Sequence, residues 1–202
     1  MEKLYLEEPT LKRKDEAIEY INEHILYNSN INGTGSLDSY TSNYEEWLDY
    51  IELMKSEETT PNNYCPGYTY FLIREKDDKI VGMINIRYNL NEKLMQHGGH
   101  IGYGIRPTER RKGYNKINLY LGLEIAKKLN IENVLLTIDI DNIGSIKTVE
   151  ALGGVLENKI NDNGKVICRY FINTEESLNK NKEYLKMIKR WNYECNRSKK
   201  FK

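Results

Sequence analysis

Seven segments of the chain alternate apolar with polar residues, or form short apolar runs, as β-strands do. Two of them, residues 68–75 and 79–90, are separated by Asp77-Asp78 and predict a hairpin of long strands. The other strands are shorter and are predicted at residues 4–7, 99–105, 133–140, 154–160 and 165–172.

Apolar residues that recur every three to four positions predict the helices. The first covers residues 14–26. The second opens with Ser42 and Glu45, a capping-box pair, and reaches Met54. Three more helices are predicted at 116–129, at 143–152 before the stop signal Gly153-Gly154, and from 174 into the C-terminal tail.

The order of these elements predicts an α/β (α+β) fold, in which helices cover both faces of a mixed, mostly antiparallel sheet. Residues 99–140 form a strand–helix–strand unit, whose two strands we expect to be parallel neighbours. A ligand is expected at the carboxyl edge of these strands, where the basic stretch "RPTERRKGYNK" at 106–116 follows the first of them.

Composition bounds the class of protein. The chain has 202 residues, 39% of them hydrophobic, which is enough for one well-buried core, so we predict a single domain over residues 1–179. Thirty basic residues balance 30 acidic ones and give no case for general nucleic-acid binding. Three dispersed cysteines without a CxxC pair indicate a reducing compartment. We expect a cytoplasmic protein without a membrane partner, because no signal-peptide core or membrane-length apolar run is apparent.

The basic stretch at 106–116 places Gly113 at the entrance of a predicted helix. The first backbone N–H groups of a helix lack intrahelical acceptors and favour an anion, and a glycine leaves the backbone open to one. A phosphate-binding turn and a solvated basic turn both fit this stretch alone. Two other phosphate motifs are excluded, since no Lys-Ser or Lys-Thr follows Gly113 and "GTGSLD" at 33–38 lacks a third glycine.

Residues 101–129, "IGYGIRPTERRKGYNKINLYLGLEIAKKL", resemble the acetyl-CoA motif of the GNAT N-acetyltransferase superfamily, [RQ]-x-x-G-x-[GA]. Arg110 and Gly113 match its first and fourth positions, whereas Asn115 stands where the family prefers Gly or Ala. Residues 141–154, "DNIGSIKTVEALGG", resemble the segment that opens the next helix of the family, with Asn142 and Ser145 in matching positions. The "GHIGY-x-IRP" run is similar to that of a bacterial subgroup of predicted acetyltransferases.

The resemblance implies a GNAT fold with a splayed pair of parallel strands, acetyl-CoA as the cosubstrate and no metal. It implies acceptor-side helices at about 14–56 and an acetyl-CoA core at about 68–157. The pantetheine would pair with backbone groups of the first splayed strand, whose bulged part would hold the thioester oxygen, and the pyrophosphate would lie on the helix entrance. The cofactor-binding residues so implied are Gly104, Ile105, Arg106, Arg111, Lys112, Gly113, Tyr114, Asn115, Lys116, Asn142 and Ser145.

The general acid and base are less well defined. Many relatives have a tyrosine seven residues after the Asn142 position, and here that residue is Val149. Asp139 is a candidate base, although a strand-end aspartate also fits a solvated or helix-capping role. Tyr103 is a candidate proton shuttle, although a tyrosine in an apolar strand also fits the core.

The three histidines give no metal site. His97 and His100 flank Gly98-Gly99, but His24 lies on the first predicted helix without reason to be near them. A catalytic His100 stays open beside a structural one.

The predicted function is transfer of an acetyl group from acetyl-CoA to a primary amine of a small-molecule acceptor, by direct attack in a ternary complex. Residues 38–58 contain seven acids and one lysine, which suits a polycationic amine but also a solvated helix face. The alternative is a non-catalytic acyl-CoA-binding module acting on a macromolecular partner. A homodimer is compatible with both.

The C-terminal tail, residues 180–202, carries nine basic and two acidic residues. This charge could serve nucleic-acid binding, yet Tyr184, Leu185, Ile188 and Trp191 recur at helical spacing and give the tail an apolar face to bury. We therefore predict a docked helix, a disordered end from about Asn196, and no nucleic-acid partner.

Overall fold

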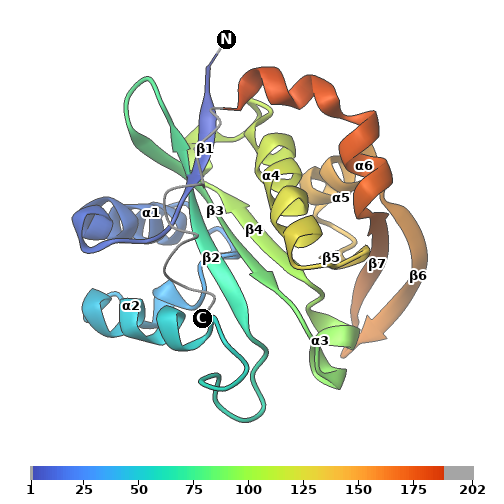
Figure 1. Cartoon of the computed structure of the whole chain (residues 1–202), viewed down its shortest axis with the longest axis horizontal. Helices are drawn as coiled ribbons and strands as arrows, with labels where there is room; N and C mark the ends of the chain where they lie inside the picture. Colours follow the sequence, from blue (N-terminus) through green and yellow to red (C-terminus); the bar gives the residue numbers. More distant parts are fainter. Residues whose placement is uncertain (1, 189–202) are drawn as a thin grey trace.

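The computed structural model of the chain describes residues 2–188 and divides its seven strands between two antiparallel sheets (Figure 1). The first sheet has the order β1-β2-β3-β4. Its strands are β1 (Leu4–Glu7), β2 (Gly67–Arg74), β3 (Lys79–Arg87) and β4 (Ile101–Ile105). The second sheet has the order β5-β7-β6, with β5 (Asn133–Asp139), β6 (Val155–Asp162) and β7 (Lys165–Asn173).

Within residues 2–188, backbone contacts join the two sheets just before β4 begins, at the middle of β5. Gly99 forms an isolated bridge with Leu136, and the backbone N–H of His100 donates to the carbonyl of Leu135 over 2.8 Å. Beyond this point no ladder joins β4 to β5 in the part of the chain that the structure describes. The predicted fold class is confirmed, but the two neighbouring strands diverge into separate sheets instead of forming a parallel ladder.

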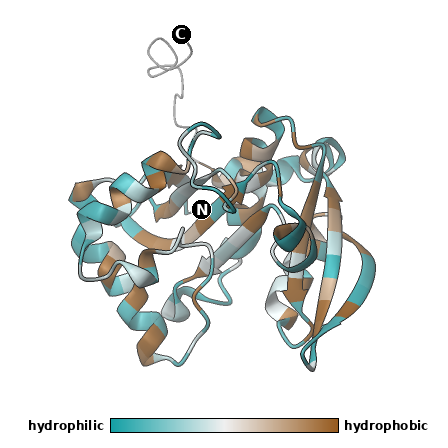
Figure 2. Ribbon diagram, turned by 90° about the horizontal axis from the view of Figure 1, so that it is seen from below, coloured by the Kyte–Doolittle hydropathy of each residue, from teal (hydrophilic) through white to brown (hydrophobic). Residues whose placement is uncertain are grey.

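Helices cover both faces of the first sheet (Figure 1). Helices α1 (Lys14–Leu26) and α2 (Tyr44–Leu53) pack on one face, where Trp47 and Phe71 stack with ring centroids 6.0 Å apart. Seen from below, these helices carry both hydrophilic and hydrophobic residues (Figure 2), as amphipathic helices do.

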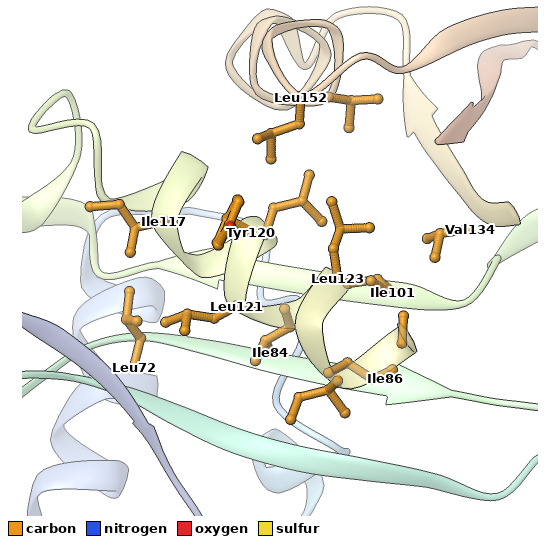
Figure 3. Packing of buried hydrophobic residues seen from close by; sticks show 14 of the residues in the cluster. Leu72, Ile84, Ile86, Ile101, Ile117, Tyr120, Leu121, Leu123, Val134 and Leu152 are labelled. Carbon is orange, nitrogen blue, oxygen red and sulfur yellow. The ribbon is translucent and has the colours of Figure 1, made fainter. Parts of the chain in front are cut away.

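On the other face α4 (Tyr114–Lys128) packs mainly against β3 and β4 and forms the larger core (Figure 3). Gly122 lets the helix approach the sheet closely, because a Cβ there would lie 2.5 Å from Ile84 Cδ1. The helix that the sequence predicts from residue 116 thus begins two residues earlier, directly after Gly113.

The cap of α2 differs from the predicted one by one residue. Asn43, not Ser42, is the N-cap, and its side-chain oxygen accepts the backbone N–H of Glu46. The Asn43 amide in turn donates to the Glu46 carboxylate over 2.8 Å. Asparagine followed three residues later by glutamate satisfies the helix start as well as the Ser42–Glu45 pair would.

The sequence pattern does not predict α3 (Glu92–His97), because residues 88–90 continue the apolar pattern of the preceding strand. In the structure β3 ends at Arg87, and the side-chain oxygen of Asn91 caps the new helix by accepting the backbone N–H of Leu94 over 2.9 Å. The last helices are α5 (Ile143–Ala151) and α6 (Thr174–Lys180).

The tail docks but is not one long helix. After α6 the chain turns at Asn181, whose side-chain amide donates to the Ser177 carbonyl over 2.8 Å. A 3₁₀ helix then covers Lys182–Met187, and the buried Ile188 lies beside Leu4 of β1. Trp191 and the end predicted to be disordered from Asn196 lie outside the described residues. Within residues 2–188, no helix combines the length and apolar character needed to cross a bilayer.

Candidate active site

Two cavities lie on either side of the junction between β3, β4 and the loop that follows α1. The larger, of about 750 Å³, is enclosed by this loop, α2, the start of β2, the end of β3 and α3, with Asn32, Asp38, Tyr50, Asn85, Arg87 and Lys93 among its lining residues. The smaller, of about 500 Å³, lies between the diverging strands β4 and β5. Tyr103, Asp139, Asn142 and Ser145 all line this smaller cavity.

The cavities share part of their lining, chiefly Asn32, Gly33 and Arg87. The loop over residues 29–36 lies directly on β4, since a Cβ on Gly33 would be 2.6 Å from Tyr103 Cα and 2.7 Å from the Gly102 carbonyl oxygen. Gly33 also has a φ of 75°. The loop therefore closes over the strand and contributes to both cavities at once.

The helix entrance predicted to bind phosphate has an open backbone. Gly113 has a φ of 83° and is the N-cap of α4 without a side-chain cap, and Arg111 has a φ of 65°. Within residues 2–188, the backbone N–H groups from Arg111 to Asn115 find no hydrogen-bond acceptor, whereas that of Lys116 donates to Gly113 over 3.2 Å. A Cβ on Gly113 would meet nothing within 4 Å. This arrangement fits a diphosphate, which accepts several N–H donors and needs close approach.

The side chains around this helix entrance differ in their contacts and in their exposure. Arg110 turns back, donating through Nε to the Ile105 carbonyl over 3.1 Å and so joining the turn to the end of β4. Lys112 pairs with Glu109 at 2.7 Å, and Arg111 is exposed. Tyr114 is buried, and its phenol contacts Arg74 and Glu2. A ligand can therefore contact Tyr114 only at its backbone, because the side chain is buried.

Asn115, the departure from the family motif, turns its side chain toward α5. Its amide donates to Thr148 Oγ1 over 3.3 Å, and its buried side-chain oxygen has no partner among residues 2–188. The extra side chain thus lies beside Thr148, and the turn keeps its open backbone.

The residues predicted to pair with pantetheine differ in the edge of β4 toward which their backbone N–H and C=O groups point. The Arg106 N–H donates to the Val81 carbonyl over 2.9 Å, toward β3, whereas the Ile105 carbonyl accepts from Arg110 on the opposite side. Because neighbouring residues of a strand face opposite edges, Tyr103 and Ile105 present their backbone groups away from β3, and Gly104 and Arg106 do not. The β3–β4 register runs from Ile101 to Ile105 without a shift, so the expected bulge is not in this stretch.

The Arg106 side chain has a structural environment. It is fully buried, and its guanidinium donates to the Ile80 carbonyl, to Glu19 and to Glu23. The two glutamates belong to α1, so this arginine fastens the helix to the end of β4.

Tyr103, Asn142 and Ser145 come together at the smaller cavity. Asn142 is the N-cap of α5, and its side-chain oxygen accepts the backbone N–H of Ser145 over 3.2 Å. The Tyr103 hydroxyl donates to the Ser145 carbonyl over 3.5 Å, a long contact that a ligand could replace. Burial raises the pKa of Tyr103, so the phenol stays protonated at neutral pH and suits an acid better than a base.

Asp139 and Val149 occupy contrasting places. Asp139 lines the smaller cavity with an exposed side chain, and its backbone carbonyl accepts the N–H of Asn142 over 2.8 Å. Val149 is fully buried under α5, against Gly154. The position at which many relatives carry a tyrosine is thus part of the core.

The histidines are structural in their contacts. His100 Nδ1 accepts the backbone N–H of Leu135 over 2.9 Å, which takes the place of a ladder hydrogen bond between β4 and β5. Burial and the nearby Arg87 lower the pKa of His100 to about 4, which keeps this nitrogen able to accept. His97 lies 3.5 Å from Asp162. Within the described part of the chain, no group of three His, Cys, Asp or Glu residues could hold a metal ion.

The acidic segment 38–58 does not face the larger cavity as a whole. Asp38 is its one acidic residue in the lining, whereas Glu45 pairs with Lys14 and Glu52 with Lys55 on the surface. The segment therefore behaves mainly as a solvated helix face.

Sequence reasoning missed the loop residues Asn32 and Gly33 and gave Asn85 and Arg87 only a minor place. In the sequence, "RYNLNEKL" at 87–94 and the nearby Asn85 are compatible with an acceptor contact through Asn85 or Arg87, and equally with an exposed hairpin edge. The structure places both residues in the lining of the larger cavity. The sequence signal that could have indicated the site is an arginine within an apolar strand, because such an arginine is partly buried and needs a polar partner.

The family model described as "Acetyltransferase (GNAT) domain" matches residues 4–155 of this chain. The chain belongs to the GNAT acetyltransferase family, and the prediction of an acetyl-CoA-dependent N-acetyltransferase is confirmed. No curated protein matches the sequence at a significant level.

Several solved structures share the fold at low sequence identity. The ribosomal-protein-S5-alanine acetyltransferase from Vibrio fischeri is 12% identical, with a TM-score of 0.63 over 87% of this chain and 96% of that one. RimJ from Mycobacterium smegmatis, in complex with CoA-disulfide, is also 12% identical, with a TM-score of 0.64 over 86% and 83%. Mutant forms of the spermidine/spermine N-acetyltransferase SpeG from Vibrio cholerae are 16% identical, with a TM-score of 0.57 over 88% and 98%.

Proposed function

We propose that this protein transfers an acetyl group from acetyl-CoA to the primary amine of a small-molecule acceptor, by direct attack within a ternary complex. The observation that carries the proposal is the continuity of the site. An open helix entrance at Gly113 is joined through Arg110 to the end of β4, and the cavity beside β4 shares its lining with a larger second cavity. The helix entrance suits the diphosphate, and the cavity beside β4 suits the pantetheine and the thioester. The larger cavity suits the acceptor.

The proposed cofactor contacts follow from these directions. The backbone N–H groups of Arg111 to Asn115 would bind the diphosphate, with Lys116 closing the first turn of α4 and the cations of Arg111 and Lys112 nearby. On β4 we place the pantetheine against the backbone of Tyr103 and Ile105, because the backbone groups of Gly104 and Arg106 face β3. Asn142 and Ser145 would contact it from α5.

In the proposed reaction the neutral amine nitrogen attacks the thioester carbonyl carbon. A C–N bond forms, the C–S bond breaks, and the electron pair leaves with the sulfur of CoA. An ammonium acceptor gives up two protons in all, of which one ends on the CoA thiol and one in solvent. The products are the acetamide and CoA, and no covalent enzyme intermediate is required.

Tyr103 is the proposed donor of the proton that the leaving thiolate takes up. It lines the cavity between β4 and β5, and its raised pKa keeps the hydroxyl protonated. Asp139, exposed at the edge of the same cavity, is the proposed acceptor of the amine proton through solvent.

A panel of amines tests the function by the release of free thiol from acetyl-CoA. The panel contains polyamines, amino acids and an alanine-initiated peptide, because the similar structures are named for spermidine, spermine and ribosomal-protein acetylation. Acceptor-dependent thiol release with at least one small amine is expected. If acetyl-CoA binds in calorimetry and no amine releases thiol, the non-catalytic acyl-CoA-binding module is the better description.

A further inference from the structure

Arg87 occupies the junction of the two cavities, and three glycines make room for it. A Cβ on Gly98 would lie 3.1 Å from Nη1 of Arg87, and a Cβ on Gly102 would lie 2.9 Å from Nη2. Gly67, opposite Arg87 in the β2–β3 ladder, would place a Cβ 3.1 Å from Arg87 Cγ. The guanidinium is therefore seated between backbone segments that carry no side chain to obstruct it.

One hydrogen bond orients the guanidinium. Arg87 Nε donates to the side-chain oxygen of Asn85 over 2.9 Å, and the Asn85 amide donates in turn to Thr69 Oγ1 over 3.0 Å. The two terminal nitrogens have no acceptor within residues 2–188. They lie at the end of the side chain that lines both cavities.

The other arginines with largely buried side chains are paired with a carboxylate. Four such pairs are Arg13 with Glu7, Arg74 with Glu109, Arg106 with Glu23, and Arg169 with Glu157. Arg87 has no ion pair among the described residues, and burial lowers its pKa below the usual range. A guanidinium nevertheless stays charged in proteins, so this half-buried cation lacks the anion that would offset its desolvation.

We propose that the missing anion is a carboxylate carried by the acceptor itself, so that the substrate is an amine with a carboxylate a few bonds away, such as an amino acid. The two terminal N–H₂ groups of a guanidinium match the two oxygens of a carboxylate. The position of Arg87, on the walls of both cavities, holds the carboxylate close to the point where the amine must meet the thioester. This inference rests on the proposed acetyl transfer to a small amine.

The charge of the larger cavity agrees with an amino acid better than with a polycation. Its charged lining consists of Asp38, Arg87 and Lys93, one carboxylate against two cations. Asp38 already accepts a hydrogen bond from Thr34 over 2.9 Å. A polyamine would place several positive charges beside Arg87 with a single carboxylate to balance them.

Matched acceptors test the proposal directly. Each of a set of amino acids is compared with its carboxamide and with the amine that lacks the carboxyl group, and kcat/KM is measured at saturating acetyl-CoA. The carboxylate form should be preferred about 100-fold over its amide. In Arg87→Met this preference should disappear, while KM for acetyl-CoA stays within about threefold.

Two further variants guard against a folding artefact. Gly102→Ala keeps the charge but displaces the guanidinium, and should reduce the preference about tenfold. Lys93→Met removes the same charge from an exposed position in the same cavity, and should change the preference less than threefold. If Arg87→Met and Gly102→Ala both fold by circular dichroism and both discriminate as the wild type does, Arg87 does not bind the carboxylate.

The anion could instead belong to the acyl group, and succinyl-CoA distinguishes this source. A wild-type preference for succinyl-CoA over acetyl-CoA that is lost in Arg87→Met would overturn the assignment to the acceptor. A large rise in KM for acetyl-CoA in Arg87→Met would overturn it as well, since Arg87 would then belong to the cofactor site.

A binding measurement separates failure of this inference from failure of the proposed function. A carboxylate on Arg87 would reduce the positive field at His100, whose pKa Arg87 lowers, so the His100 pKa should rise. We expect this rise in an NMR titration of the wild type with the free amino acids, and not with their amides. Absence of the rise with every amino acid refutes the carboxylate site, whether or not any amine is acetylated.

Discussion

Two glycine-containing segments border the site, and they use glycine for opposite reasons. Gly113 at the entrance of α4 and Gly33 in the loop after α1 both have positive φ, 83° and 75°. An added Cβ would meet nothing within 4 Å at Gly113, but would lie 2.6 Å from Tyr103 Cα at Gly33. One glycine leaves its backbone open to a ligand, and the other lets two backbone segments touch.

The comparison shows that backbone conformation alone does not mark a binding position. Both glycines relieve the strain of a left-handed conformation, which would cost a bulky residue about 1–3 kcal/mol. Only the surrounding space tells which of them serves packing and which serves binding. The same substitution at the two positions should therefore give opposite results in stability and in ligand affinity.

Gly33→Val should have the largest effect on stability. The strain of the conformation and the overlap with the β4 backbone act together, and we expect a loss of about 3 kcal/mol in the free energy of unfolding. Activity should fall as well, because the loop lines both cavities. Chemical denaturation measures the first effect. An unchanged unfolding midpoint would show that the loop does not lie on β4 as described.

Gly113→Val is the matched substitution, with the effects reversed. The added side chain projects into open space, so stability should fall only by the conformational strain. The dissociation constant for acetyl-CoA should rise about 100-fold, because the side chain occupies the approach to the open N–H groups. Calorimetry measures this constant. Equal affinity in the variant and the wild type would remove the diphosphate from this turn.

Tyr103→Phe sharpens the comparison at the residue that Gly33 touches. The ring and its packing are kept, and only the hydroxyl near Ser145 is lost. We expect kcat to fall about 10- to 100-fold with KM for both substrates little changed, as for the loss of a proton donor. If kcat is unchanged, the thiolate leaves without help from Tyr103.

Asn142→Ala should have the smallest effect of the four. Loss of the cap on α5 should lower stability by about 1 kcal/mol. KM for acetyl-CoA should rise up to about tenfold if the amide also meets the cofactor. Asn142→Asp provides the control, since it keeps the cap acceptor and removes the amide donor. A variant that changes the unfolding midpoint alone would leave Asn142 the role of a cap.

The sequence predicts the proposed cofactor side of the site because its residues are contiguous. A strand, a basic turn with Gly113 and a helix follow one another within residues 101–129, so one short stretch carries the signal. Residues 141–154 supply a second such stretch at the next helix. Even there, sequence could not tell that Arg106 is fully buried between β3 and α1, because its glutamate partners lie on a distant helix.

The acceptor side could not be predicted in the same way. Its cavity is assembled from the loop at 31–38, α2, the hairpin of β2 and β3, and a helix that begins at Glu92. Each segment reads as loop, core or surface when taken alone, and the acidic pattern of 38–58 pointed to a cavity that these residues mostly do not face. The role proposed for Arg87 rests on its lack of a carboxylate partner among residues 2–188, which the sequence does not show.

The divergence of β4 from β5 leaves one edge of a sheet without a neighbouring strand. The edge of β4 that faces away from β3 presents backbone groups without strand partners among residues 2–188, and another strand can pair with an edge of this kind. Here β5 of the second sheet lies beside that edge, with a bridge between Gly99 and Leu136, and a cavity of about 500 Å³ is lined by residues of both strands. A slender ligand chain can enter such a space, whereas an incoming strand would bring side chains on both of its faces. The arrangement that leaves an edge open to a ligand would thus also hinder its pairing with a strand of another chain.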